Sequence, residues 1–111
     1  MRSKRFTRGG LLTPWDARVL RARSVMLRAG AVMEWHTTGA REELLIAIAG
    51  AVEVETEGGG RRRRRRLLGG ACCFLPQETV HRVVNRSRRL AHYLYVTAPR
   101  TSMRAHATSS R

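Results

Sequence analysis

Glycines divide this sequence into short segments, and that division limits most strongly how the chain can fold. Glycines stand at Gly30 and Gly50 and in clusters at residues 58–60 and 69–70. The segments between them are apolar or alternate between apolar and polar residues, and none keeps a helical period over roughly 11 residues. Many short strands with turn signals between them are typical of a β-sandwich or barrel. The pattern therefore predicts an all-β chain.

The expected strands lie between two segments that resemble tails. A chain of 111 residues supports one domain. We expect a basic N-terminal tail over residues 1–14, a β-barrel domain over residues 15–98 and a polar, basic C-terminal tail over residues 99–111. The strands are expected at residues 19–27, 31–38, 44–49, 51–57, 61–68, 71–75, 82–85 and 90–97.

The charge of the chain is large but unevenly placed. The net charge is +14, from 22 Lys plus Arg against 8 Asp plus Glu. The two tails hold seven of the basic residues and no acid, and six further arginines form one run at residues 61–66. The remaining domain is nearly neutral. Because nucleic-acid modules usually spread basic residues over a face and interleave aromatic residues, we do not expect nucleic-acid binding from this arginine-rich chain.

The arginine run follows a strand with alternating acids. Glu53, Glu55 and Glu57 share one face of that strand, and the glycines at 58–60 would turn residues 61–66 back beside them. Cross-strand ion pairs would then offset three of the six arginine charges. A charged surface hairpin is the favoured interpretation, and an anion-binding surface is the alternative.

Cysteine use and hydropathy point to the cytoplasm. Cys72 and Cys73 are adjacent, and neighbouring residues on a strand face opposite ways, so we expect free thiols in a reducing compartment. One of the two should point inward and pack as a small apolar residue. We find no apolar stretch long enough for a membrane helix and no signal-peptide pattern, so we expect no membrane association.

Two segments of the predicted barrel carry a recognisable spacing of residues. The first contains Gly30, His36, Glu43 and Gly50, and the second contains Gly70, Pro76, His81 and Asn85. Both resemble the two signature motifs of the cupin superfamily, whose RmlC-like fold is a small jelly roll, or double-stranded β-helix barrel. The sequence departs from the family pattern twice. Thr38 stands where the second histidine is expected, and Glu78 replaces a glycine.

The resemblance implies a metal site inside the barrel. Carried over by position, His36, Glu43 and His81 would bind a divalent metal, which could be Fe, Mn, Zn, Ni or Cu. Two histidines and one carboxylate resemble the facial triad of non-haem iron enzymes and are equally compatible with zinc. The neutral hydroxyl of Thr38 is a poor ligand, so whether Thr38 or another group completes the site stays open.

Strand alternation adds candidates around the metal. If His36 points inward, Glu34 and Thr38 share its face, and Glu34 could be a further ligand or a catalytic base. Thr38 and Tyr95 are candidates for the pocket wall. Tyr93 and Tyr95 alternate with His92 and Leu94, and the sequence does not say which pair faces inward.

Three functions compete. A metal-dependent enzyme acting on a small organic molecule comes first, with a dioxygenase favoured over an isomerase, lyase or hydrolase. A non-catalytic cupin that binds or senses a small molecule is the second, and an anion-binding accessory protein using residues 61–66 is the third. The resemblance also implies a homodimer.

Overall fold

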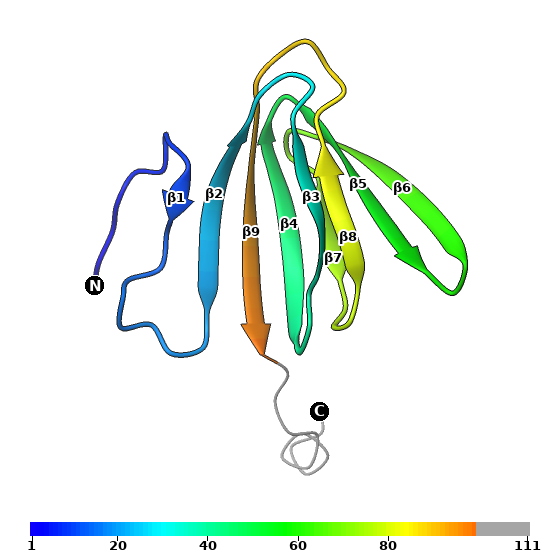
Figure 1. Ribbon diagram of the computed structural model, residues 1–111. Helices are drawn as coiled ribbons and strands as arrows, with labels where there is room; N and C mark the ends of the chain where they lie inside the picture. The colour runs from blue at the N-terminus through cyan, green and yellow to red at the C-terminus, as the bar shows by residue number, and fades with distance from the viewer. Residues whose placement is uncertain (100–111) are drawn as a thin grey trace.

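The computed structural model describes residues 1–99 and shows a barrel built only of strands (Figure 1). No helix occurs in this range. The strands in chain order are β1 (Gly10–Leu11), β2 (Arg21–Leu27), β3 (Val32–Thr37), β4 (Arg41–Ala49), β5 (Ala51–Gly58), β6 (Arg61–Leu68), β7 (Cys72–Leu75), β8 (Val80–Val84) and β9 (Ala91–Pro99).

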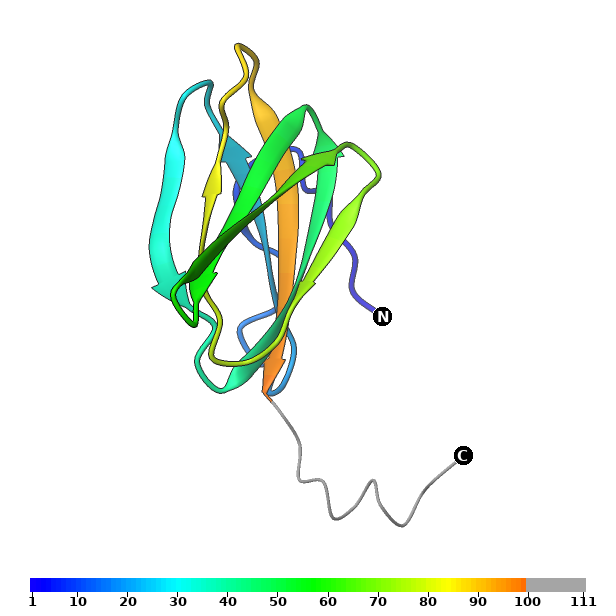
Figure 2. The ribbon, with the colours of Figure 1, turned by 90° about the vertical axis from the view of Figure 1, so that its right-hand side faces the viewer.

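The strands form two antiparallel sheets that pack against each other. One sheet has the order β1-β2-β9-β4-β7 and the other has the order β3-β8-β5-β6. Figure 2 shows the β5–β6 hairpin crossing over the strands of the five-stranded sheet. This is the jelly-roll arrangement, so the predicted all-β fold class is confirmed.

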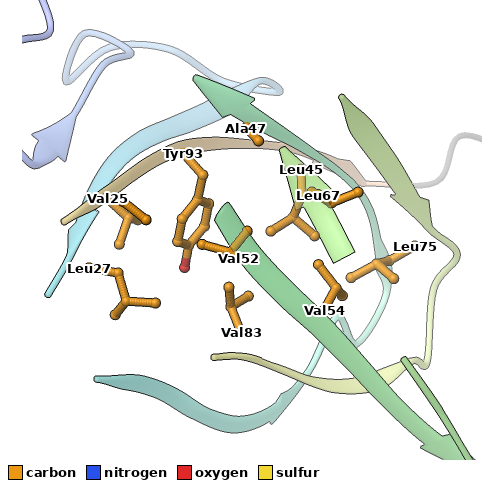
Figure 3. Close-up of a cluster of buried hydrophobic side chains, with 11 residues drawn as sticks. Val25, Leu27, Leu45, Ala47, Val52, Val54, Leu67, Leu75, Val83 and Tyr93 are labelled. Atoms are coloured by element: carbon orange, nitrogen blue, oxygen red, sulfur yellow. The ribbon is translucent and has the colours of Figure 1, made fainter. Parts of the chain in front are cut away.

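The inner faces of both sheets supply one apolar core. Its members include Val25, Leu45, Val54, Leu67 and Tyr93, each no more than 8% exposed (Figure 3). They come from strands far apart in the sequence, so the core forms only when the two sheets meet. Each fully buried side chain of this size contributes about 1.5–3 kcal/mol relative to solvent exposure.

The core shows which face of the last strand, β9, points inward. Tyr93 is 1% exposed, and Tyr95 packs against the same cluster, so both tyrosines face inward. His92 belongs to the opposite face, where its Nε2 lies 2.7 Å from the Ser24 hydroxyl. On β7, Cys73 packs against the core and Cys72 is exposed, so the expected inward cysteine is Cys73.

Two backbone positions explain features of the sequence pattern. Gly50 has a φ of 76°, and a Cβ there would lie 2.8 Å from the carbonyl oxygen of Leu90, so only glycine fits this turn. Glu78 has a φ of 59° and is the one non-glycine residue of the described chain in the left-handed region. It occupies the motif position where cupins carry glycine, so the pattern there reflects a conformational requirement.

The segment 1–14 is not entirely a tail. Gly10 and Leu11 pair with Ser24 and Arg23 as strand β1, and the Leu12 amide donates a 2.8 Å hydrogen bond to the Ala22 carbonyl. Without β1, strand β2 would be the edge of its sheet and would leave backbone groups unpaired, and this short segment satisfies some of them. Alternation and composition give no signal for so short a strand. Apart from Pro99, which ends β9, the C-terminal tail predicted at residues 99–111 lies outside the described residues.

The outer face of the four-stranded sheet carries ion pairs that differ from the expected ones. Glu57 pairs with Arg62 at 3.3 Å, as predicted. Glu55 instead pairs with Arg82 at 3.0 Å and Arg86 at 2.7 Å, although Arg64 lies directly opposite it on β6.

Glu53 follows the same pattern as Glu55. It pairs with Arg86 at 3.0 Å rather than with Arg66, its partner in the strand register. The expectation that the hairpin would neutralise three of its own arginines was therefore wrong. Strand β5 lies between β6 and β8, and its acids Glu53 and Glu55 pair with Arg82 on β8 and with Arg86 just after β8.

Within residues 1–99, no helix is long and apolar enough to cross a membrane.

Candidate metal centre

His81 is the most enclosed residue of the candidate centre. It lies on β8 and is 0% exposed. Its Nδ1 lies 3.1 Å from the Thr79 carbonyl oxygen, which accepts a hydrogen bond when Nδ1 carries the proton. Its Nε2 is buried without a hydrogen-bond partner among the described residues. A backbone carbonyl on one nitrogen and a free lone pair on the other is the usual arrangement of a metal-binding histidine.

His36 lies beside His81 on the neighbouring strand. The two residues are register partners of β3 and β8, and their ring centroids are 4.2 Å apart. The Nδ1 of His36 lies 2.7 Å from the Glu34 carbonyl oxygen, so the same tautomer is favoured and Nε2 is left for a ligand. His36 is exposed while His81 is buried, so the pair faces an opening of the barrel.

Glu43 completes the group from the opposite sheet. It lies on β4, is 7% exposed, and places Oε2 3.5 Å from Nε2 of His81. One ligand atom from each of His36, Glu43 and His81 lies within 4.8 Å of the others. Two ligands bound at about 2.1 Å can lie at most about 4.2 Å apart, so a small side-chain adjustment closes the group around an ion. The donors and the orphaned nitrogen fit a divalent transition metal.

The electrostatics of His81 reflect its carboxylate neighbour. Burial by itself lowers the pKa of His81, but Glu43 and the Thr79 carbonyl favour the protonated ring and the net pKa is raised. The carboxylate therefore stabilises a positive charge at this point. A proton on Nε2 and a metal cation would occupy the same place.

Thr38 does not offer its hydroxyl to this centre. The residue is 9% exposed, and its Oγ1 donates to the Pro76 carbonyl at 2.8 Å and accepts from the Thr79 amide at 2.9 Å. These bonds tie the end of β3 to the turn before β8. Where the family pattern has a ligand, this chain has a link between the two motifs.

A bulge moves Glu34 away from the position that alternation predicts. Met33 pairs with Val83 and His36 pairs with His81, so Glu34 and Trp35 together stand opposite the single residue Arg82. Trp35 lies against Arg82, whose guanidinium is 4.9 Å from the ring centroid. Glu34 is exposed and meets His36 through its backbone carbonyl rather than its carboxylate. The role of Glu34 as a catalytic base thus stays a prediction without a contact to support it.

Asn85 of the second motif and Tyr95 both lie in the interior of the barrel. Asn85 is 0% exposed and donates from Nδ2 to the carbonyls of Leu27 and Arg89, at 2.9 and 2.7 Å. Tyr95 is a register partner of Leu45 and packs against the core on the inner face of the barrel, and its role in a pocket wall stays a prediction.

One feature that the sequence analysis missed is a cavity beside the centre. It has a volume of about 460 Å³ and lies between β6 and the segment around β7. Its lining includes Thr56, Leu75 and Thr79. Thr56 is the register partner of His81, Leu75 is that of Glu43, and Thr79 accepts from His81. The alternation of β6 indicates this surface, because Arg65, Arg63 and Arg61 lie on the same face of the strand as buried Leu67.

This chain has the cupin fold: a two-sheet antiparallel barrel with a His, Glu and His group at one opening. Neither family models nor curated protein sequences match it, so the assignment comes from solved structures. KdgF from Halomonas sp. is 26% identical, with a TM-score of 0.70, over 85% of this chain and 79% of that chain. A Cupin 2 conserved barrel domain protein from Salinispora arenicola is 23% identical, with a TM-score of 0.71, over 93% and 84%.

Other similar structures are larger proteins. The Schizosaccharomyces pombe Cnp3 cupin domain is 15% identical with a TM-score of 0.72, and oxalate oxidase is 17% identical with a TM-score of 0.68. The chain spans 60% of the former and 42% of the latter. The resemblance to cupins is confirmed at the level of the fold, and these two structures share only that fold with the chain.

Proposed function

We propose that this cupin holds a divalent transition metal through His36, Glu43 and His81 and acts there on a small organic molecule. The observation that carries the proposal is the buried Nε2 of His81, which has no hydrogen-bond partner within residues 1–99 and lies 3.5 Å from Oε2 of Glu43, with His36 alongside. A buried polar atom without a partner is costly, and a metal ion would satisfy it. When bound, such a metal supplies Lewis-acid or redox chemistry to the substrate.

The chain's own residues have separate tasks. The carbonyls of Glu34 and Thr79 fix the tautomer and orientation of the two rings. Glu43 contributes the one negative charge of the group and lies in a largely water-free position. A cavity lined by Thr56 and Leu75, the register partners of His81 and Glu43, lies beside the group and supports binding of a small molecule there.

Among enzyme activities we favour a dioxygenase-like one. Two histidines and a carboxylate leave several coordination positions free, which suits simultaneous binding of an organic substrate and oxygen. Oxalate oxidase, which shares the fold, has been solved with the substrate analogue glycolate, a small organic acid. Isomerase or lyase chemistry becomes the proposal if the bound metal is redox-inert.

A non-catalytic binding module is the second candidate. The observation in its favour is Thr38, whose hydroxyl is committed to backbone groups where the family pattern has a further ligand. A three-residue site can still bind metal, but it need not turn a substrate over.

Metal analysis of untagged protein tests the proposal. We expect close to one equivalent of one metal per chain after reconstitution with Fe, Mn, Zn, Ni or Cu in turn. His81→Ala should abolish binding, and His92→Ala should retain it, because His92 lies on the opposite face with Ser24. Less than about 0.2 equivalents in the unmodified chain with every metal would contradict the proposal. Metal binding without turnover of any organic acid under oxygen would favour the binding module.

A further inference from the structure

The arginine run divides between the two faces of strand β6. Leu67 is buried in the core at 6% exposure, so Arg65, Arg63 and Arg61 point to the same inner side. The register agrees, because Arg65 pairs with buried Val54 and Arg63 with Thr56. Arg62, Arg64 and Arg66 consequently lie on the other face with the acids of β5, although Arg64 also borders the cavity and all six arginines are exposed.

The three inner arginines border the cavity beside the candidate metal centre. All three belong to its lining, together with Thr56, Leu75 and Thr79. As shown above, these last three residues are direct neighbours of His81 and Glu43. The cavity that the guanidinium groups border is therefore lined by direct neighbours of His81 and Glu43, which do not line it themselves.

The inner arginines also lack acidic partners. Of the ion pairs within residues 1–99, none involves Arg61, Arg63 or Arg65. Two glutamates, Glu57 and Glu78, also line the cavity, and Glu57 is already paired with Arg62. Four arginines against two glutamates leave this wall with a positive excess, and guanidinium groups gathered in this way attract anions.

We propose that Arg61, Arg63 and Arg65 form the anion-binding wall of this cavity and that its ligand is a small organic anion carrying at least two negative groups. Alternate residues of a strand are about 6.8 Å apart, so the row extends over about 14 Å and suits separated charges better than one. Carboxylates and phosphates share the chemistry that a guanidinium recognises. As a statement about the substrate, this inference rests on the proposed function and deepens it.

The alternation supplies a matched control for the test. A double variant of the inner face, Arg63→Gln with Arg65→Gln, is compared with a double variant of the outer face, Arg62→Gln with Arg66→Gln, whose two arginines do not line the cavity. Both remove two positive charges from the same strand. Calorimetric titrations of metal-free full chain use tricarballylate, succinate, inorganic phosphate and neutral succinamide as probes.

We expect tricarballylate to bind the unmodified chain and the inner variant to lose at least about tenfold in affinity, while the outer variant stays within about threefold. Succinamide should not bind. Stronger binding of phosphate than of either carboxylate would identify the ligand as a phosphate ester, still on the same wall. Equal losses in both double variants, or no binding of any anion, would overturn the inference. If the inner double variant does not fold, Arg63→Gln and Arg66→Gln replace the two doubles.

Metal content separates this inference from the proposed function. The inner variant should bind the same equivalents of metal as the unmodified chain, because its arginines are not ligands. Selective anion loss in a chain that binds no metal would retain the arginine wall and reject the metal enzyme. Normal metal binding with equal anion losses in both variants would do the reverse.

Discussion

The Nε2 atom of His81 lies 3.5 Å from Oε2 of Glu43, and the two residues come from opposite sheets of the barrel. The centre is thus assembled where the sheets meet. His81 is held on its other side by the Thr79 carbonyl at 3.1 Å, so its ring cannot turn freely to another partner. An ion bound here would join the two sheets and raise the free energy of unfolding.

Glu43→Gln should weaken metal binding by more than about 100-fold while keeping the volume of the side chain. The amide removes the single negative charge of the group and the contact that raises the pKa of His81. Titration calorimetry measures the affinity, and Glu42→Gln, at an exposed neighbouring position, is the control. Similar affinities in the two variants would mean that Glu43 is not a ligand.

Metal affinity should also rise with pH. Because the pKa of His81 is raised, its proton competes with the metal below that pKa and is lost above it. Affinities measured on either side of neutrality should therefore be higher at the more alkaline pH. A flat profile between pH ~6 and ~8 would show that no histidine proton is displaced.

Glu55→Gln should destabilise the barrel by about 1–3 kcal/mol. Glu55 is 1% exposed and holds Arg82 and Arg86 across the outer face. Burial raises the pKa of Glu55, but the hydrogen bonds and charges of Arg86 and Arg82 together lower it by more, so the net pKa is lowered.

The lowered pKa fixes the direction of the pH dependence. The ion pairs contribute stability above the unfolded-state pKa of Glu55, and this contribution is lost as the pH falls through the lower folded-state pKa. Urea unfolding at neutral and acidic pH should show a steeper acid loss in the unmodified chain than in Glu55→Gln. Parallel pH profiles would show that Glu55 is not the group responsible.

Glu78→Gly should raise the free energy of unfolding by about 0.5–1 kcal/mol. The residue has a φ of 59°, which costs little for glycine and more for a residue with a Cβ. Glu78→Ala separates conformation from charge, since it removes the carboxylate but keeps the Cβ. Thermal or chemical denaturation of both variants gives the comparison, and equal stabilisation by alanine would point to the charge instead.

Thr38→Val should cost about 1–3 kcal/mol of stability and leave metal affinity unchanged. The substitution leaves the Thr79 amide and the Pro76 carbonyl without the hydroxyl that now joins them. Thr38→Ser keeps the hydroxyl and should recover most of the loss. A drop in metal affinity for Thr38→Val with unchanged stability would instead make Thr38 part of the metal centre.

Local pattern was enough to predict several parts of the structure. The hairpin from residue 51 to residue 68 follows from its alternation and its glycines, and β6 was expected at the residues where it occurs. The resemblance to the cupin motifs singled out His36, Glu43 and His81, which the fold brings together. The strand predictions depend on period-two alternation and turn chemistry, which act over a few residues.

Other parts of the structure could not be predicted from local pattern, because they depend on contacts with a second or third strand. The bulge that turns Glu34 away is defined by the pairing of β3 with β8. Glu55 on β5 pairs with Arg82 and Arg86, on and just after β8, rather than with the arginine directly opposite on β6. Alternation and glycine turns predict every strand except β1, and the resemblance to cupins names His36, Glu43 and His81 as candidate metal ligands. Which arginines of β6 border the cavity depends on the tertiary structure, because one buried residue, Leu67, sets the orientation of the whole strand against the core.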